Sequence, residues 1–110
     1  MAKFLAVYTG TPGGPTPDQA TIAKGMQAWN DWMAKHAASV VEGGGPLGKT
    51  KRADAKGVSD VRNDMAAYVI VQAETHEAAA KLFVNHPHFT IFPGEAVDIM
   101  ECLPIPGTAR

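Results

Sequence analysis

The residues best suited to chemistry are two histidines that flank a proline, His86 and His88. Proline favours an extended conformation for the residue before it, and in an extended segment residues i and i+2 point the same way. The two imidazoles are therefore expected to converge, either as metal ligands or as an adjacent acid and base. The structural alternative is that His86 bonds the last carbonyls of the preceding helix while His88 is partly solvated. The nearest carboxylates, Glu95 and Asp98, offer no obvious third ligand, so neither a metal nor another cofactor is predicted.

A third histidine, His36, lies seven residues after Trp29 and four after Trp32. This spacing places it on the same side of a helix as both indoles. His36 is therefore a candidate proton carrier in a pocket with aromatic walls, to which Trp32 would contribute a ligand-binding surface. The alternative is a histidine at the C-terminal end of a helix, where the helix dipole favours its positive charge.

Alternation along the expected strands predicts which side chains line a cleft. The purely aliphatic sets suit the side covered by helices, which leaves Tyr8, Tyr68 and Gln72 on the other face as ligand-binding candidates. By the same reasoning Asp98 faces this cleft. A carboxyl group in a partly closed space would have a raised pKa and could accept or donate a proton. Equally, Asp98 could be a carboxylate at a dimer interface, paired with a tyrosine hydroxyl.

Two further features are interpreted as structural. The segment from Gly43 to Thr50 satisfies the P-loop pattern, but no apolar helix follows it, and a proline inside it removes one of the amides that a phosphate would need. A glycine-rich turn is therefore predicted there. The single cysteine, Cys102, is expected to be a small buried apolar residue.

The candidate residues depend on four expected strands, two helices and an arm. A strand over 4–8 precedes a helix with Thr16 as N-cap, Pro17 at its first position, and an apolar stripe. A short strand over 39–42, an exposed arm or hairpin over 49–64, and a strong strand over 67–74 follow. Thr75 then caps a second helix, with Glu77 in its first turn, that stops by 85–87, and the last strand covers 96–103. The stripe of the first helix contains Ile22, Met26, Trp29 and Met33.

This order predicts a single domain, residues 1–110, of the α+β class. It is the split βαβ arrangement of ferredoxin-like folds, an antiparallel sheet with both helices on one face. Of the 45% of residues that are hydrophobic, 18 are alanine, so 32 larger apolar or cysteine residues remain for the core. The uncovered face of the sheet is therefore expected to pack against a second copy, which encloses a cleft between two sheets.

Charge and hydropathy exclude several classes of partner. Ten basic and eleven acidic residues give a formal net charge of −1, so no global field favours nucleic acid or an anionic membrane surface. The apolar start of the chain becomes polar by Thr9, too early for a signal peptide or a membrane span. A cytoplasmic protein without nucleic-acid or membrane partners is expected.

The order and spacing of several short motifs resemble the YCII-related, or DGPF-domain, family. The motifs follow a first strand with an aromatic residue near its end, and the resemblance extends from Phe4 to Gly107. It implies a ferredoxin-like domain that forms a dimeric α/β barrel, in a mainly bacterial family of largely unassigned activity. The motifs are Trp29-x-x-Trp32-Met33, Gly44-Gly45-Pro46-Leu47, Ala67-Tyr68, His86-Pro87 and Pro104-Ile105-Pro106-Gly107.

The chain departs from this family at two places. The Asp-Gly-Pro-Phe signature is absent, and Val58-Ser59-Asp60-Val61 stands in the corresponding stretch. The histidine of the His-Asp pair proposed for the enzymatic branch would fall near Ala28 or Trp29, so that pair is not carried over.

The sequence leaves three functional hypotheses open and does not decide whether the protein is an enzyme. The first is a protein that binds a small molecule in the cleft of a homodimeric barrel, with cofactor-independent acid–base catalysis by Asp98 or by one of His36, His86 and His88. The second is a non-catalytic dimeric interaction or regulatory module. The third is a monooxygenase-like or isomerase-like barrel, which rests on analogy of fold alone.

Overall fold

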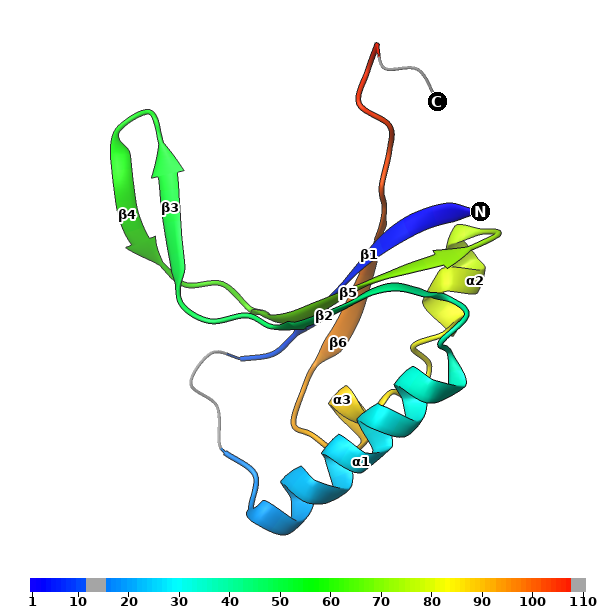
Figure 1. The fold of residues 1–110 in the computed structure, drawn as a ribbon. Coiled ribbons are helices and arrows are strands. Elements are labelled where there is room, and N and C mark those ends of the chain that lie inside the picture. The colour runs from blue at the N-terminus through cyan, green and yellow to red at the C-terminus, as the bar shows by residue number, and fades with distance from the viewer. Residues whose placement is uncertain (12–15, 108–110) are drawn as a thin grey trace.

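The computed structural model describes residues 1–11 and 16–107, and its elements follow the predicted order, including a hairpin within 49–64, with one short helix added (Figure 1). The strands are β1 (Ala2–Thr9), β2 (Val40–Pro46), β3 (Thr50–Asp54), β4 (Gly57–Val61), β5 (Met65–Ala73) and β6 (Ala96–Glu101). The helices are α1 (Gln19–Lys35), α2 (His76–Lys81) and α3 (Pro87–Thr90).

The main sheet has four strands in the order β2-β5-β1-β6, and every neighbouring pair is antiparallel. This is the strand order of a ferredoxin-like split βαβ fold, so the predicted α+β class is confirmed. The sheet is open, and the chain does not close into a barrel by itself. The helices lie on one side of the sheet (Figure 1).

The helix-covered face of the sheet carries the core. The β1 register places Phe4 opposite Val71 and Ala6 opposite Val69, and all four side chains are buried. Tyr8 follows them on the same face and is only 1% exposed. The prediction that Tyr8 faces away from the helices is therefore wrong. Every residue from 4 to 8 is apolar or aromatic. The alternation of side chains therefore could not show which face of the first strand is covered by the helices.

The opposite face of the sheet is uncovered, as predicted for Tyr68, Gln72 and Asp98. In the register, Val7 lies between Tyr68 on β5 and Asp98 on β6, and Leu5 lies between Ile70 and Met100. Asp98 is exposed, and Met100 is 43% exposed. This face therefore presents aliphatic and aromatic side chains without a covering layer.

The first helix starts and packs differently from the prediction. Its N-cap is Asp18, whose carboxylate accepts a hydrogen bond from the Thr21 backbone N–H at 2.7 Å, so Thr16 lies outside the helix. Asp is as good an N-cap as Thr, and the local sequence offers both. The buried side of the helix contains Gly25 and Trp32, whereas Ile22 and Met26 of the predicted stripe are exposed.

Two short helices replace the single second helix of the prediction. Thr75 caps α2 as expected, and its hydroxyl accepts a hydrogen bond from the Ala78 backbone N–H at 3.0 Å. The chain then turns through Asn85, which has a positive φ of 60°, and starts α3 at Pro87. His86 is the N-cap of α3, a role that the sequence interpretation did not consider.

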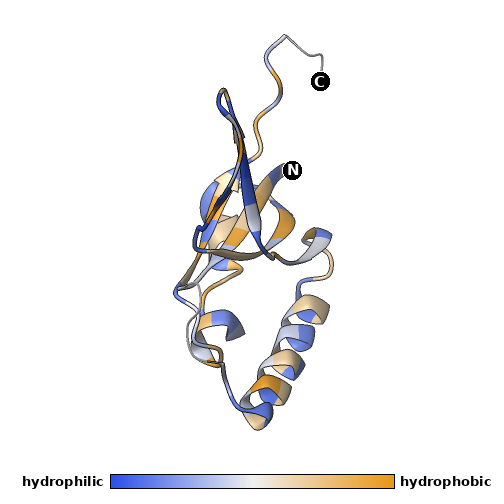
Figure 2. Ribbon diagram, turned by 90° about the vertical axis from the view of Figure 1, so that its left-hand side faces the viewer, coloured by the Kyte–Doolittle hydropathy of each residue, from blue (hydrophilic) through white to orange (hydrophobic). Residues whose placement is uncertain are grey.

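The glycines at 43–45 belong to β2, so the predicted turn is wrong and the strand extends four residues beyond the predicted 39–42. The segment is followed by β3 and not by the helix that a P-loop requires. Gly44 has a φ of +63°, and a Cβ there would overlap the Tyr68 carbonyl, so only glycine fits this position. After β2 the chain enters the β3–β4 hairpin, called the arm below, which projects from the sheet in Figure 1 and is mostly hydrophilic in Figure 2.

The last strand ends at Glu101, two residues earlier than predicted, and the chain then leaves the sheet. Cys102 is exposed, so the expectation of a buried cysteine is wrong. Its backbone N–H still bonds the Lys3 carbonyl at 2.9 Å, but its side chain lies beyond the sheet core. Within residues 1–11 and 16–107, no helix has the length and apolar character needed to cross a membrane.

Candidate functional site

The candidate site is a cluster of rings where the end of β1 meets the start of α3. Tyr8 extends from β1, and His86 and His88 come from the N-terminal end of α3. The centroid of the Tyr8 ring lies 5.0 Å from that of His86 and 5.2 Å from that of His88. The two histidines thus meet in one cluster because each ring packs against Tyr8. The extended geometry predicted for them is wrong, since His88 is helical and His86 caps the helix.

The hydrogen bonds of His86 determine which of its ring nitrogens carries the proton. Its Nδ1 accepts a hydrogen bond from the His88 backbone N–H at 3.0 Å, so in the neutral ring the proton is assigned to Nε2. That nitrogen lies 3.3 Å from the Tyr8 hydroxyl oxygen, to which it donates. His86 thus links the cap of α3 to the end of β1.

Burial sets the charge of both partners in this pair. Desolvation, helped by the nearby His88 and His36, lowers the pKa of His86 to about 4. Desolvation also raises the pKa of Tyr8 above its ordinary value of 10.0. Both side chains are neutral at neutral pH, so this pair orients its neighbours and carries no charge.

His88 has different hydrogen-bond partners from His86, and one of its ring nitrogens has no partner among the described residues. Its Nε2 donates to the Thr9 backbone carbonyl at 2.7 Å, which leaves the lone pair of the neutral ring on Nδ1. No described residue hydrogen-bonds that Nδ1, and no buried side-chain nitrogen among the described residues lacks a partner. The Nδ1 atom therefore retains some solvent-accessible surface, although His88 as a whole is only 7% exposed.

Aromatic rings exclude water from the inner side of the cluster. The Trp29 ring meets the His86 ring edge-on at 4.6 Å, and the Trp32 ring lies 4.8 Å from it. The Trp32 indole also donates from Nε1 to the Leu82 carbonyl at 2.8 Å, which fixes the ring between α1 and α2. The two tryptophans thus form an apolar wall behind the histidines.

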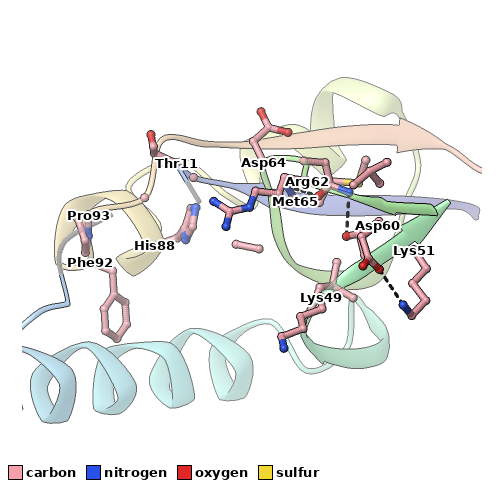
Figure 3. Close-up of a pocket in the computed structure, with 18 residues that line it drawn as sticks. Thr11, Lys49, Lys51, Asp60, Arg62, Asp64, Met65, His88, Phe92 and Pro93 are labelled. Atoms are coloured by element: carbon pink, nitrogen blue, oxygen red, sulfur yellow. Dashed lines mark hydrogen bonds and ion pairs between the residues drawn. The ribbon is translucent and has the colours of Figure 1, made fainter. Parts of the chain in front are cut away.

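An open groove of about 1280 Å³ lies on the outer side of the cluster, and His88 lines it (Figure 3). The strand ends and the arm form one wall, and the loop after α3 forms the other. Gly94 in that loop lies so close to His88 that a Cβ would be 2.3 Å from Nε2, so the loop packs directly on the ring. The lining residues with larger side chains are Leu47, Lys49, Thr50, Lys51, Asp60, Val61, Arg62, Asn63, Asp64, Met65, His88, Phe92 and Pro93.

The remaining predicted residues do not join this cluster. His36 is the C-cap of α1 and lies 4.8 Å from the Trp32 ring, behind the tryptophan wall, as its structural alternative proposed. Burial and the charge of Lys35 lower its pKa. Tyr68 and Gln72 lie on the uncovered face beside β2, where Gln72 bonds the Ala38 carbonyl at 3.2 Å.

Asp98 is also separate from the histidines, since it is exposed on the uncovered face of β6. In the single chain it lacks the enclosed surroundings that the sequence interpretation assumed.

Of the residues that line the groove, only His88 was predicted from the sequence, and the missed ones include Lys49, Arg62 and Phe92. Lys49 and Arg62 flank the hairpin, where charged residues are ordinarily solvated, and Phe92 follows α3 in a short loop. The sequence of the hairpin holds no signal for this placement, because it depends on how the hairpin lies relative to the loop after α3.

The cluster does not have the composition of a metal centre. Among the residues that the structure describes, no three His, Cys, Asp or Glu side chains gather closely enough to hold a metal ion. Three of the four ring nitrogens of His86 and His88 already have protein partners. The arrangement is suited to proton transfer at His88 Nδ1, with the Thr9 carbonyl stabilising the charged ring.

Comparison with known proteins supports the fold. No protein-family model matches the chain, and no curated protein matches it significantly. Among solved structures, a similar one is 5-chloro-2-hydroxyhydroquinone dehydrochlorinase from Burkholderia phenoliruptrix, in complex with 2,5-dihydroxybenzoquinone. The two share 19% sequence identity over 88% of this chain and 89% of the enzyme, with a TM-score of 0.56. The chain therefore has the same α+β fold as this small-molecule enzyme.

Proposed function

We propose that the protein binds a small organic molecule in the groove beside His88, and that His88 acts there as a cofactor-independent acid–base group. The observation that carries this proposal is the hydrogen bond from His88 Nε2 to the Thr9 carbonyl, at the edge of a groove. It holds the ring in one tautomer and leaves Nδ1 as a proton acceptor facing solvent.

The proposed step is a proton transfer. His88 Nδ1 takes a proton from a bound O–H or C–H group, whose bonding electrons remain on the ligand as an anion. The resulting imidazolium carries protons on both nitrogens, and its Nε2–H remains bonded to the Thr9 carbonyl. Return of the proton to another ligand atom or to water restores the neutral ring.

The fold neighbour suggests the first ligands to test. That enzyme is a dehydrochlorinase of a chlorinated hydroquinone, and its structure contains bound 2,5-dihydroxybenzoquinone. Such rings carry ionisable O–H groups, which are the groups on which an imidazole base acts. Because the two proteins share 19% identity, these compounds serve here as probes of the groove.

The test is a titration of the protein with 2,5-dihydroxybenzoquinone, followed by NMR. Binding should change the ring ¹⁵N signals of His88 and the signals of Phe92. His88→Gln should weaken binding about tenfold, because a charge-assisted hydrogen bond is lost. The matched control is His76→Gln, since His76 is an exposed histidine bonded to the Ile99 carbonyl outside the groove.

Several outcomes would contradict the proposal. Unchanged His88 ring shifts at saturating ligand would exclude this histidine as the acceptor, and this readout in the wild-type protein does not depend on any variant folding. Equal affinity of wild type and folded His88→Gln would do the same. Signal changes confined to the uncovered face of the sheet would place binding elsewhere.

We also propose that the chain is a YCII-related protein and functions as a homodimer. The ordered motifs from Trp29 to Gly107 and the ferredoxin-like strand order support the family. The uncovered apolar face, which includes Leu5, Ile70 and Met100, supports a second copy as its covering layer. A dimer without ligand binding would favour the alternative of a non-catalytic interaction module.

A further inference from the structure

The arm contributes an excess of positive charge to the groove. Lys49, Lys51 and Arg62 line it from the arm and its base, together with the carboxylates of Asp60 and Asp64. Lys51 Nζ lies 2.7 Å from Asp60 Oδ1, so these two charges neutralise each other. In Figure 3 the Asp64 carboxylate, in the connection between β4 and β5, points away from Lys49.

The two remaining cations lie at the base of the arm, just outside the β3–β4 ladder. The ladder ends with Thr50 paired to Val61. Lys49 directly precedes β3 and Arg62 directly follows β4, and both side chains line the groove. Among the described residues, neither Lys49 nor Arg62 has a carboxylate partner.

The other side of the groove is apolar. Phe92 and Pro93 extend from the loop after α3, and Leu47 and Met65 extend from the strand ends at the base of the arm. Phe92 is half-buried, with its ring against Gly25 of α1. The groove therefore combines an apolar wall, a pair of cations and a histidine base.

We infer that the ligand of this groove is an organic anion with an apolar body, whose carboxylate or phenolate group is bound by Arg62 and Lys49. This inference rests on the proposed function, and it names the class of ligand that the groove would take. The guanidinium of Arg62 can bind both oxygens of a carboxylate, and Lys49 supplies a second charge. The apolar part of the ligand packs against Phe92.

Physical chemistry disfavours a neutral ligand in the same place. A neutral body would remove water from two cations without supplying a compensating charge, which costs free energy. A cationic ligand would meet like charges on one wall of the groove. The arm thus selects by charge, while the apolar wall contributes affinity.

The experiment compares three probes of the same shape and different charge: benzoate, benzamide and benzylamine. Each is titrated at fixed ionic strength, because exposed charges are screened by salt, and amide and histidine NMR signals are recorded. The variants are Arg62→Gln and Lys49→Gln. The matched control is Arg52→Gln, which removes a positive charge from the opposite face of the arm, outside the groove lining.

Benzoate is expected to shift the signals of Phe92 and His88 and to bind most tightly of the three probes. Each groove variant should weaken benzoate about threefold or more, and the double variant about tenfold. Arg52→Gln should leave the affinity of benzoate unchanged. The affinity of benzamide should change little in any variant.

The possible failures can be distinguished. If benzamide bound in the groove as tightly as benzoate, the inference about charge would be overturned, while ligand binding beside His88 would stand. If Arg52→Gln weakened benzoate as much as Arg62→Gln, the effect would be nonspecific and the inference would again fail. If no probe shifted the groove signals, both the inference and the proposed binding role would be contradicted.

Discussion

At the scale of single residues, the neutral charge of His86 connects the site to stability. Its pKa in the folded protein is about 4, against an ordinary value of 6.5. Between these two pH values the unfolded chain takes up a proton that the folded chain does not. The unfolded state is therefore favoured progressively as the pH falls through this range.

We predict that the free energy of unfolding decreases as the pH falls from about 6.5 to about 4. The contribution of His86 is on the order of 2–3 kcal/mol, because each pKa unit corresponds to about 1.4 kcal/mol. Urea denaturation at a series of pH values measures it. His86→Gln should flatten this part of the profile, whereas the exposed His76→Gln should retain it. A profile of equal slope in His86→Gln would contradict the assignment.

The sequence predicted the convergence of His86 and His88 but not the role of either one. The cap that His86 forms depends on α3, a helix of four residues that has no apolar periodicity to detect. Likewise Tyr8 lies in an entirely apolar run, so only the packing of α1 and α3 shows which face it occupies. Neighbours far apart in sequence, such as Thr9 and His88, produce the chemistry of the site.

At the scale of elements, α1 and the loop after α3 meet at Gly25 and Phe92. A Cβ on Gly25 would lie 2.4 Å from two atoms of the Phe92 ring, so the absence of a side chain allows the ring to lie against the helix. The contact positions Phe92 as a wall of the groove.

We predict that Gly25→Ala destabilises the wild-type protein although alanine favours helix by about 1 kcal/mol over glycine. The clash should displace the Phe92 ring and outweigh this preference. In a Phe92→Ala background the clash is absent, so the same Gly25→Ala change should be stabilising. Thermal denaturation of the four proteins in this double-mutant cycle measures the coupling. Additive effects would show that the two elements do not meet as described.

Most elements were predictable because their signals are local. Thr75 and Glu77 mark the start of α2, and the β-branched run in β5 marks the strongest strand. The packed side of α1 was harder to predict, because Gly25 contributes a contact by lacking a side chain. Sequence periodicity counts apolar side chains, so it selected Ile22 and Met26 in its place.

At the scale of the whole molecule, the chain is more extended than a compact domain. Its radius of gyration is 15.8 Å, whereas a compact domain of this length would have about 13 Å. The arm and the C-terminal segment both project from the sheet (Figure 1). The helices cover only one face, so a second chain would cover the remaining apolar face and restore a compact shape.

We predict a particle of about twice the 11.6 kDa of one chain in light scattering coupled to size-exclusion chromatography. Ile70→Lys should shift it to the monomer, because Ile70 lies at the centre of the uncovered face, opposite Leu5. Val58→Lys is the control, since Val58 is 71% exposed on the arm. A wild-type monomer at all concentrations, or a dimer unaffected by Ile70→Lys, would contradict a dimer through this face.

The glycine-rich strand β2 has a consequence for aggregation. It forms one outer edge of the sheet, where the left-handed backbone of Gly44 and the missing N–H of Pro46 interrupt the row of groups that an added strand would need. On the opposite edge, formed by β6, His76 Nε2 is hydrogen-bonded to the Ile99 carbonyl oxygen at 2.7 Å, so this carbonyl is not free to pair with another strand. Growth of the sheet from molecule to molecule through its edges, as in a fibril, is thus hindered at both borders, so association is directed to the apolar face and away from the edges.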